Sequence, residues 1–66
     1  MRITVNGKET EVAEGLSVQD FIVSRDLTKA MVIVELNRNV IQRQSWPDVR
    51  FKADDRVEII NILGGG

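Results

Sequence analysis

The dipeptide Asn6-Gly7 constrains the fold most, because it joins two short segments in which apolar and polar residues alternate. This alternation is typical of strands with one buried face. Asn and Gly both tolerate the positive φ angles of a type I′ turn, whose twist suits two antiparallel strands. We therefore predict a hairpin in which residues 8–13 pair with residues 2–6.

A helix is predicted to begin after Ser17, whose side chain can accept a hydrogen bond from the backbone N–H of Asp20. Apolar residues then recur at a spacing close to the helical period. The helix should extend for about two to three turns and bury one stripe. The residues of this stripe are Val18, Phe21, Ile22 and Leu27.

Strand patterns return after the helix. Residues 31–36 form an apolar run interrupted only by Glu35, which is typical of a well-buried strand. A turn at residues 37–39 leads to a short edge strand at residues 40–41. Residues 56–63 form the final strand, after an irregular segment.

The irregular segment contains Trp46 followed by Pro47. A lone Trp can anchor a partner, but a Trp beside Pro in a loop more often covers a core, and we interpret Trp46 in that way. The pairs Glu35 with Glu58 and Asp54 with Asp55 are acids without a histidine or an internal cleft beside them. We interpret them as solvated strand faces and a turn, and we expect no catalytic or metal-binding residue in the chain.

This order of elements predicts an α+β roll, in which a mixed sheet of four to five strands packs on one helix. The order resembles the β-grasp fold of ubiquitin. In that arrangement the last strand runs parallel to the first in the middle of the sheet, which accounts for its apolar character. With 66 residues the chain has room for one domain, which we expect at residues 1–63, followed by a glycine tail at residues 64–66.

Composition excludes several classes of function. The chain has no cysteine and no histidine, so it lacks a thiol nucleophile and the usual general base at neutral pH. Its net charge of -1 comes from charges spread along the sequence, which is unlike a nucleic-acid-binding protein. The first ten residues lack the charged and apolar pattern expected of a signal peptide, and no apolar stretch approaches the ~20 residues that span a membrane. We expect a monomer in the cytoplasm that binds no nucleic acid and no membrane.

Three glycines, Gly64, Gly65 and Gly66, directly follow the last strand. Glycine has no side chain to pack and loses much backbone freedom on ordering, so we expect a mobile tail. A tail without Cβ atoms can enter a narrow channel in a partner and deliver the terminal carboxylate to a reactive centre.

The chain resembles the ThiS-type sulfur carriers of thiamine biosynthesis in three segments, ITVNGKE, VIVELNRNVI and DRVEIINILGGG. The resemblance implies that an E1-like, ThiF-type enzyme adenylates the carboxylate of Gly66 with ATP and magnesium. Sulfur from a cysteine desulfurase then replaces AMP, and a ThiG-type thiazole synthase takes the sulfur from the resulting thiocarboxylate. Gly64 and Gly65 would give access to Gly66, and the chain itself would bind no cofactor.

Two other functions are compatible with the same fold and ending. One is the small subunit of molybdopterin synthase, which resembles ThiS but tends to be longer. The other is a ubiquitin-like modifier, whose terminus forms an amide with a lysine. The acceptor of the activated carboxylate distinguishes them, because sulfide gives a thiocarboxylate and an amine gives an amide.

The final strand also predicts a docking surface. Alternate residues face opposite sides of a sheet, so Val57 and Ile59 share one side. Glu58 identifies the other side as the solvent side. We predict that the remaining residues on or next to that side, Ile60, Ile62 and Leu63, form an exposed apolar patch for a partner beside the tail. The alternative is a strand covered on both sides within the domain.

Overall fold

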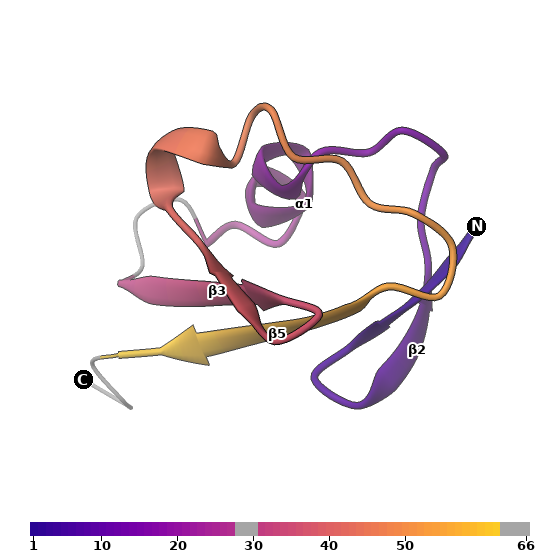
Figure 1. Ribbon diagram of the computed structural model, residues 1–66, viewed down its shortest axis with the longest axis horizontal. Helices are drawn as coiled ribbons and strands as arrows, with labels where there is room; N and C mark the ends of the chain where they lie inside the picture. The colour runs from indigo at the N-terminus through magenta and orange to yellow at the C-terminus, as the bar shows by residue number, and fades with distance from the viewer. Residues whose placement is uncertain (28–30, 63–66) are drawn as a thin grey trace.

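The computed structural model describes residues 1–27 and 31–62. These residues form one five-stranded sheet with α1 across one of its faces (Figure 1). The elements are β1 (Arg2–Val5), β2 (Lys8–Glu11), α1 (Val18–Ser24), β3 (Val32–Leu36), β4 (Asn39–Ile41), the 3-10 helix η1 (Arg43–Ser45) and β5 (Arg56–Asn61).

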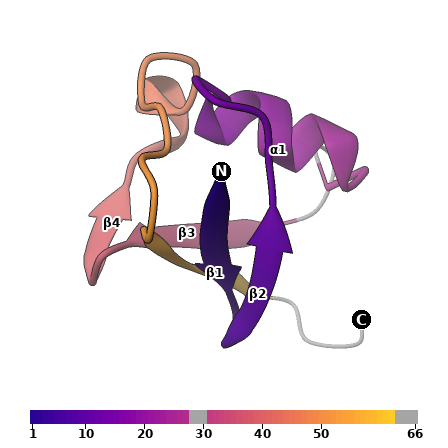
Figure 2. The same ribbon diagram turned by 90° about the vertical axis from the view of Figure 1, so that its right-hand side faces the viewer.

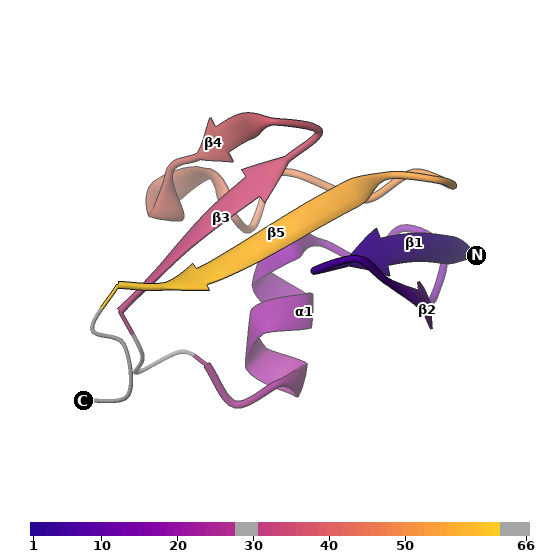
Figure 3. The ribbon, with the colours of Figure 1, turned by 90° about the horizontal axis from the view of Figure 1, so that it is seen from below.

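The strand order in the sheet is β2-β1-β5-β3-β4 (Figure 3). β1 and β5 are parallel, whereas β1 with β2, β3 with β4 and β3 with β5 are antiparallel. The last strand therefore lies in the middle of a mixed sheet and β4 forms an edge, as predicted. The predicted division between residues 1–63 and 64–66 lies outside the described residues.

The hairpin forms at the predicted turn. Asn6 and Gly7 have φ angles of 49° and 82°, both in the left-handed region that a type I′ turn requires. Val5 lies opposite Lys8 in the ladder. The second strand ends at Glu11, two residues earlier than predicted.

The start of α1 is held by a side chain and by a distant loop. Ser17 Oγ accepts a hydrogen bond of 3.0 Å from the backbone N–H of Asp20, as predicted. The N–H of Val18 donates to the carbonyl of Val49 at 2.8 Å. These bonds satisfy N–H groups that have no partner within the helix, and they attach the irregular segment to α1.

The core lies between α1, the inner face of the sheet and the irregular segment (Figure 2). The rings of Phe21 and Phe51 meet edge to face with centroids 5.8 Å apart. Trp46 is 3% exposed and its indole N–H donates to the carbonyl of Ile41 at 3.1 Å. Its interpretation as a residue that covers the core is confirmed. The buried apolar residues are Ile3, Val18, Phe21, Ile22, Val34, Trp46, Phe51 and Val57.

The prediction that residues 31–36 form a well-buried strand is wrong for one of its two faces. Val34 is 1% exposed, but its neighbour Ile33 is 36% exposed and Met31 is 51% exposed. The described helix covers only one face of the sheet, so the other face of β3 meets solvent (Figure 2). A chain this small has too few residues for a second covering layer.

Candidate functional site

The two faces of β5 differ as predicted. Val57 is 1% exposed and Ile59 packs against the core. Glu58, Ile60 and Ile62 are exposed on the opposite side. The predicted facing of this strand is therefore confirmed, and its alternative, a strand covered on both sides, is excluded.

Two further apolar residues lie beside Ile60 and Ile62. Ile33 on β3 is directly opposite Ile60 in the antiparallel ladder. The N–H of Ile62 donates to the carbonyl of Met31 at 2.8 Å, which continues this ladder by one pair. We call Met31, Ile33, Ile60 and Ile62 the outer apolar patch.

Met31 and Ile33 are absent from the patch predicted from the sequence. The signal was present, because Glu35 follows them at two-residue intervals and, like Glu58 on β5, identifies the solvent side of its strand. Leu63, the third residue of the predicted patch, lies outside the described residues. The patch adjoins the end of β5, from which the chain continues into residues 63–66.

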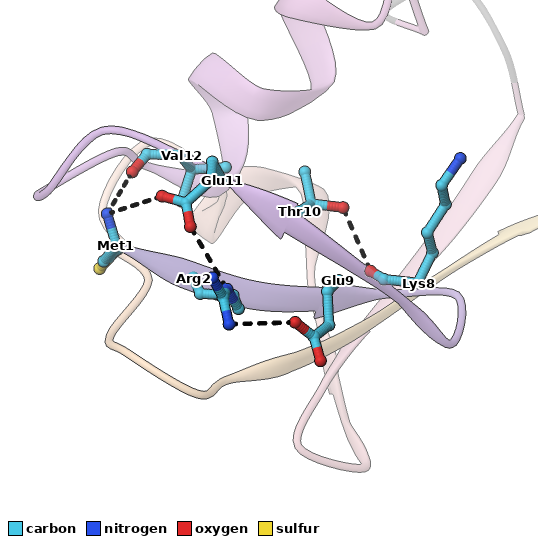
Figure 4. Close-up of polar contacts among 7 residues, drawn as sticks. All are labelled: Met1, Arg2, Lys8, Glu9, Thr10, Glu11 and Val12. Carbon is cyan, nitrogen blue, oxygen red and sulfur yellow. Dashed lines mark hydrogen bonds and ion pairs between the residues drawn. The ribbon is translucent and has the colours of Figure 1, made fainter.

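The other half of the outer face, on β1 and β2, is charged. Arg2 is 3.2 Å from a carboxylate oxygen of Glu9 and 3.3 Å from one of Glu11 (Figure 4). The N-terminal ammonium of Met1 is 3.8 Å from Glu11 and donates to the carbonyl of Val12 at 2.8 Å. The charges of this half are thus paired within the chain.

The acidic pairs lie on the strand faces and in the turn that the sequence predicts, although Glu35 is half-buried rather than fully exposed. Glu35 and Glu58 lie opposite each other on β3 and β5 and line an open surface depression of about 560 Å³. Asp55 accepts hydrogen bonds from the backbone N–H of Lys52 and from the side chain of Asn37. Among residues 1–27 and 31–62, no group of three or more His, Cys, Asp or Glu residues is placed to hold a metal ion.

The predicted reactive residues, Gly64, Gly65 and Gly66, lie outside the described residues. No helix in the described part of the chain is long and apolar enough to cross a membrane. The site that the structure does describe is therefore a surface, the outer apolar patch at the end of β5.

Comparison with protein families identifies what this surface belongs to. The model of the ThiS family matches residues 2–66, which is nearly the whole chain and includes the glycine tail. The chain belongs to the ThiS family. The sulfur carrier protein ThiS of Bacillus subtilis is 31% identical to this ThiS-family chain over 65 residues, covering 97% of the chain and 98% of that protein.

A crystal structure of the thiamine biosynthesis protein ThiS from Geobacter metallireducens superposes with a TM-score of 0.85 at 38% identity, over 100% of both chains. The ubiquitin-like β-grasp fold and the resemblance to ThiS-type sulfur carriers are thereby confirmed. A thiazole synthase of Magnetococcus marinus is 27% identical over 66 residues, and this ThiS-family chain spans only 20% of that protein's length.

Proposed function

We propose that this chain carries sulfur as a thiocarboxylate on Gly66 and donates it to a ThiG-type thiazole synthase in thiamine biosynthesis. The observation that supports the proposal most is the match to the ThiS family, which extends through Gly66. The same match favours the thiamine pathway over molybdopterin synthesis and over protein modification.

Activation has to precede sulfur transfer, because a carboxylate has no good leaving group. In the proposed cycle a ThiF-type enzyme joins the Gly66 carboxylate to the α-phosphate of ATP, with magnesium, and releases pyrophosphate. A cysteine desulfurase supplies the sulfur as a protein-bound persulfide, whose outer sulfur attacks the acyl carbon as AMP leaves. A thiol reductant then cleaves the resulting acyl disulfide and releases the thiocarboxylate. Gly64 and Gly65 give the terminus access to the enzyme, since neither has a side chain.

The choice of thiazole synthase as the acceptor has separate support. Thiazole synthases of Magnetococcus marinus and Paramagnetospirillum magneticum each contain a segment similar to this whole chain. Such a segment lies at high effective concentration beside the rest of its own protein. We propose that in the present chain the same encounter takes place between two separate proteins.

The outer apolar patch is the proposed docking surface. Its four described residues are each 36% to 52% exposed, and together they form one contiguous apolar area on two adjacent strands. A partner that buries Ile60 and Ile62, together with Leu63, holds the domain at the strand end from which the glycines emerge in the sequence.

A thiazole-requiring bacterial strain that lacks its own carrier tests the proposal. The chain should restore growth without thiazole. Deleting Gly66, or extending the chain beyond it with an uncleaved peptide, should abolish growth, because the reacting carboxylate is displaced. Growth supported by the extended chain would contradict a mechanism at Gly66.

A further inference from the structure

The parallel pairing of β1 with β5 ends early. The paired residues are Thr4 with Arg56 and Val5 with Val57, and the last main-chain bond runs from the N–H of Asn6 to the carbonyl of Val57 at 2.9 Å. β5 continues to Asn61. Its second half, which carries Ile60, thus extends beyond its main-chain ladder with β1.

The side chain of Asn6 extends this ladder by one residue. Its Oδ1 accepts a hydrogen bond of 2.7 Å from the N–H of Ile59, and its Nδ2 donates to the carbonyl of Ile59 at 3.3 Å. A carboxamide presents an acceptor and a donor in the same plane as a peptide group does. It therefore replaces the strand residue that β1 does not provide.

Asn is suited to both tasks at this position. The φ angle of 49° lies in the left-handed region, which Asn adopts more readily than most residues with a side chain. Gly satisfies the turn but offers no amide. Asp keeps the acceptor for the Ile59 N–H but loses the donor. The turn function and the bond to Ile59 can therefore be separated by mutation.

We propose that Asn6 is a positioning residue, whose side chain fixes the orientation of the second half of β5 and hence presents Ile60 and Ile62 to the activating enzyme in one arrangement. The inference rests on the proposed function for its kinetic consequence. Its structural part, the clamp on Ile59, stands on the hydrogen bonds alone. On the other side, β3 pairs with β5 along residues 57–61, so loss of the clamp leaves the sheet intact.

Asn37 provides a matched control. It also has a left-handed φ angle, 51°, and its Oδ1 accepts a hydrogen bond of 2.9 Å from the N–H of Arg56. Its side chain thus clamps β5 as well, but at the strand's beginning, away from the outer apolar patch. Asn37→Gly removes this bond, together with the bond from its Nδ2 to Asp55 at 3.0 Å, without touching the part of β5 that carries the patch.

The experiment compares Asn6→Gly with Asn37→Gly. NMR order parameters and amide exchange should show that Asn6→Gly mobilises residues 59–62 and exposes the Ile59 N–H at least about tenfold more often. With a ThiF-type enzyme, ATP and magnesium, the KM for the carrier should rise about fivefold, with kcat within about twofold. Asn37→Gly should leave KM within about twofold at a similar melting temperature.

Equal KM values for the two variants, or unchanged exchange and order at Ile59 in Asn6→Gly, would overturn the inference. If Asn6→Gly does not fold, Asn6→Asp takes its place and should show a smaller rise of KM. If the unmutated chain is not adenylated at all, the proposed function fails instead, and the NMR comparison still decides whether Asn6 orients β5.

Discussion

The two halves of the outer sheet face present different kinds of side chain to solvent. On β1 and β2, Arg2 pairs with Glu9 and Glu11, so the charges are matched within the chain. On β3 and β5, the outer apolar patch exposes four large apolar side chains, which no other part of residues 1–27 and 31–62 covers. Both halves belong to one sheet, and both meet water.

The difference indicates which half meets a partner. Ion pairs between exposed side chains contribute little to stability, but they keep a surface soluble and self-contained. Contiguous exposed apolar residues have no such benefit for a free monomer and are typical of interaction surfaces. In this chain they lie at the end of the strand that continues into the glycines.

The largest effect, on folding itself, is expected for a substitution on the inner face of the sheet. Val57→Asp places an unpaired carboxylate in the core, which costs at least about 4 kcal/mol and approaches the total stability of a domain this small. Circular dichroism and thermal melting should show loss of cooperative folding. A folded Val57→Asp variant would mean that β5 has been assigned the wrong faces.

Ile60→Asp should have the next largest effect. It should weaken binding to the partner but leave the domain folded. Ile60 is 45% exposed, so a carboxylate there stays hydrated and the melting temperature should change by at most about 5 °C. The KM for the carrier in adenylation should rise about tenfold, because an apolar contact is replaced by a charge. An unchanged KM would exclude this part of the patch from docking.

Met31→Ser tests whether the patch includes the residue that the sequence analysis missed. Its side chain lies at the margin of the patch and is flexible, so its loss should raise the KM about threefold. Steady-state adenylation kinetics measure this change. A KM equal to that of the unmutated chain would restrict the docking surface to the other three residues.

Arg2→Gln should have the smallest effect. It breaks the exposed ion pairs with Glu9 and Glu11, which together stabilise the fold by about 0.5 kcal/mol. Adenylation kinetics should stay within about twofold of the unmutated chain. A loss as large as that of Ile60→Asp would assign docking to the charged half and reverse the comparison.

Much of the fold could be predicted from local signals. Three local patterns each fit few structures: the turn pair Asn6-Gly7, the helix cap Ser17 and the alternation around Glu58. The predictions made from all three are confirmed. The facing of Ile60 and Ile62 followed from the same alternation. Glu35 offered the same information for β3, but the apolar run around it was interpreted as burial on both faces.

Two features depend on pairing that a single sequence does not display. The neighbours of Ile60 and Ile62 are set by the antiparallel register of β3 with β5, which brings together residues 27 to 31 positions apart. The bond from Asn6 to Ile59 joins residues 53 positions apart and arises because β1 is shorter than β5. Local periodicity contains neither the register nor the difference in strand length.

Intact mass spectrometry tests the central claim, that the Gly66 terminus of this chain carries sulfur. The chain is incubated with ATP, magnesium, a ThiF-type enzyme, a cysteine desulfurase, cysteine and a thiol reductant. The account predicts the mass increase of one oxygen exchanged for sulfur, located on Gly66 by fragmentation and absent without ATP. An unchanged mass, or an amide bond to another protein in place of the thiocarboxylate, would contradict it.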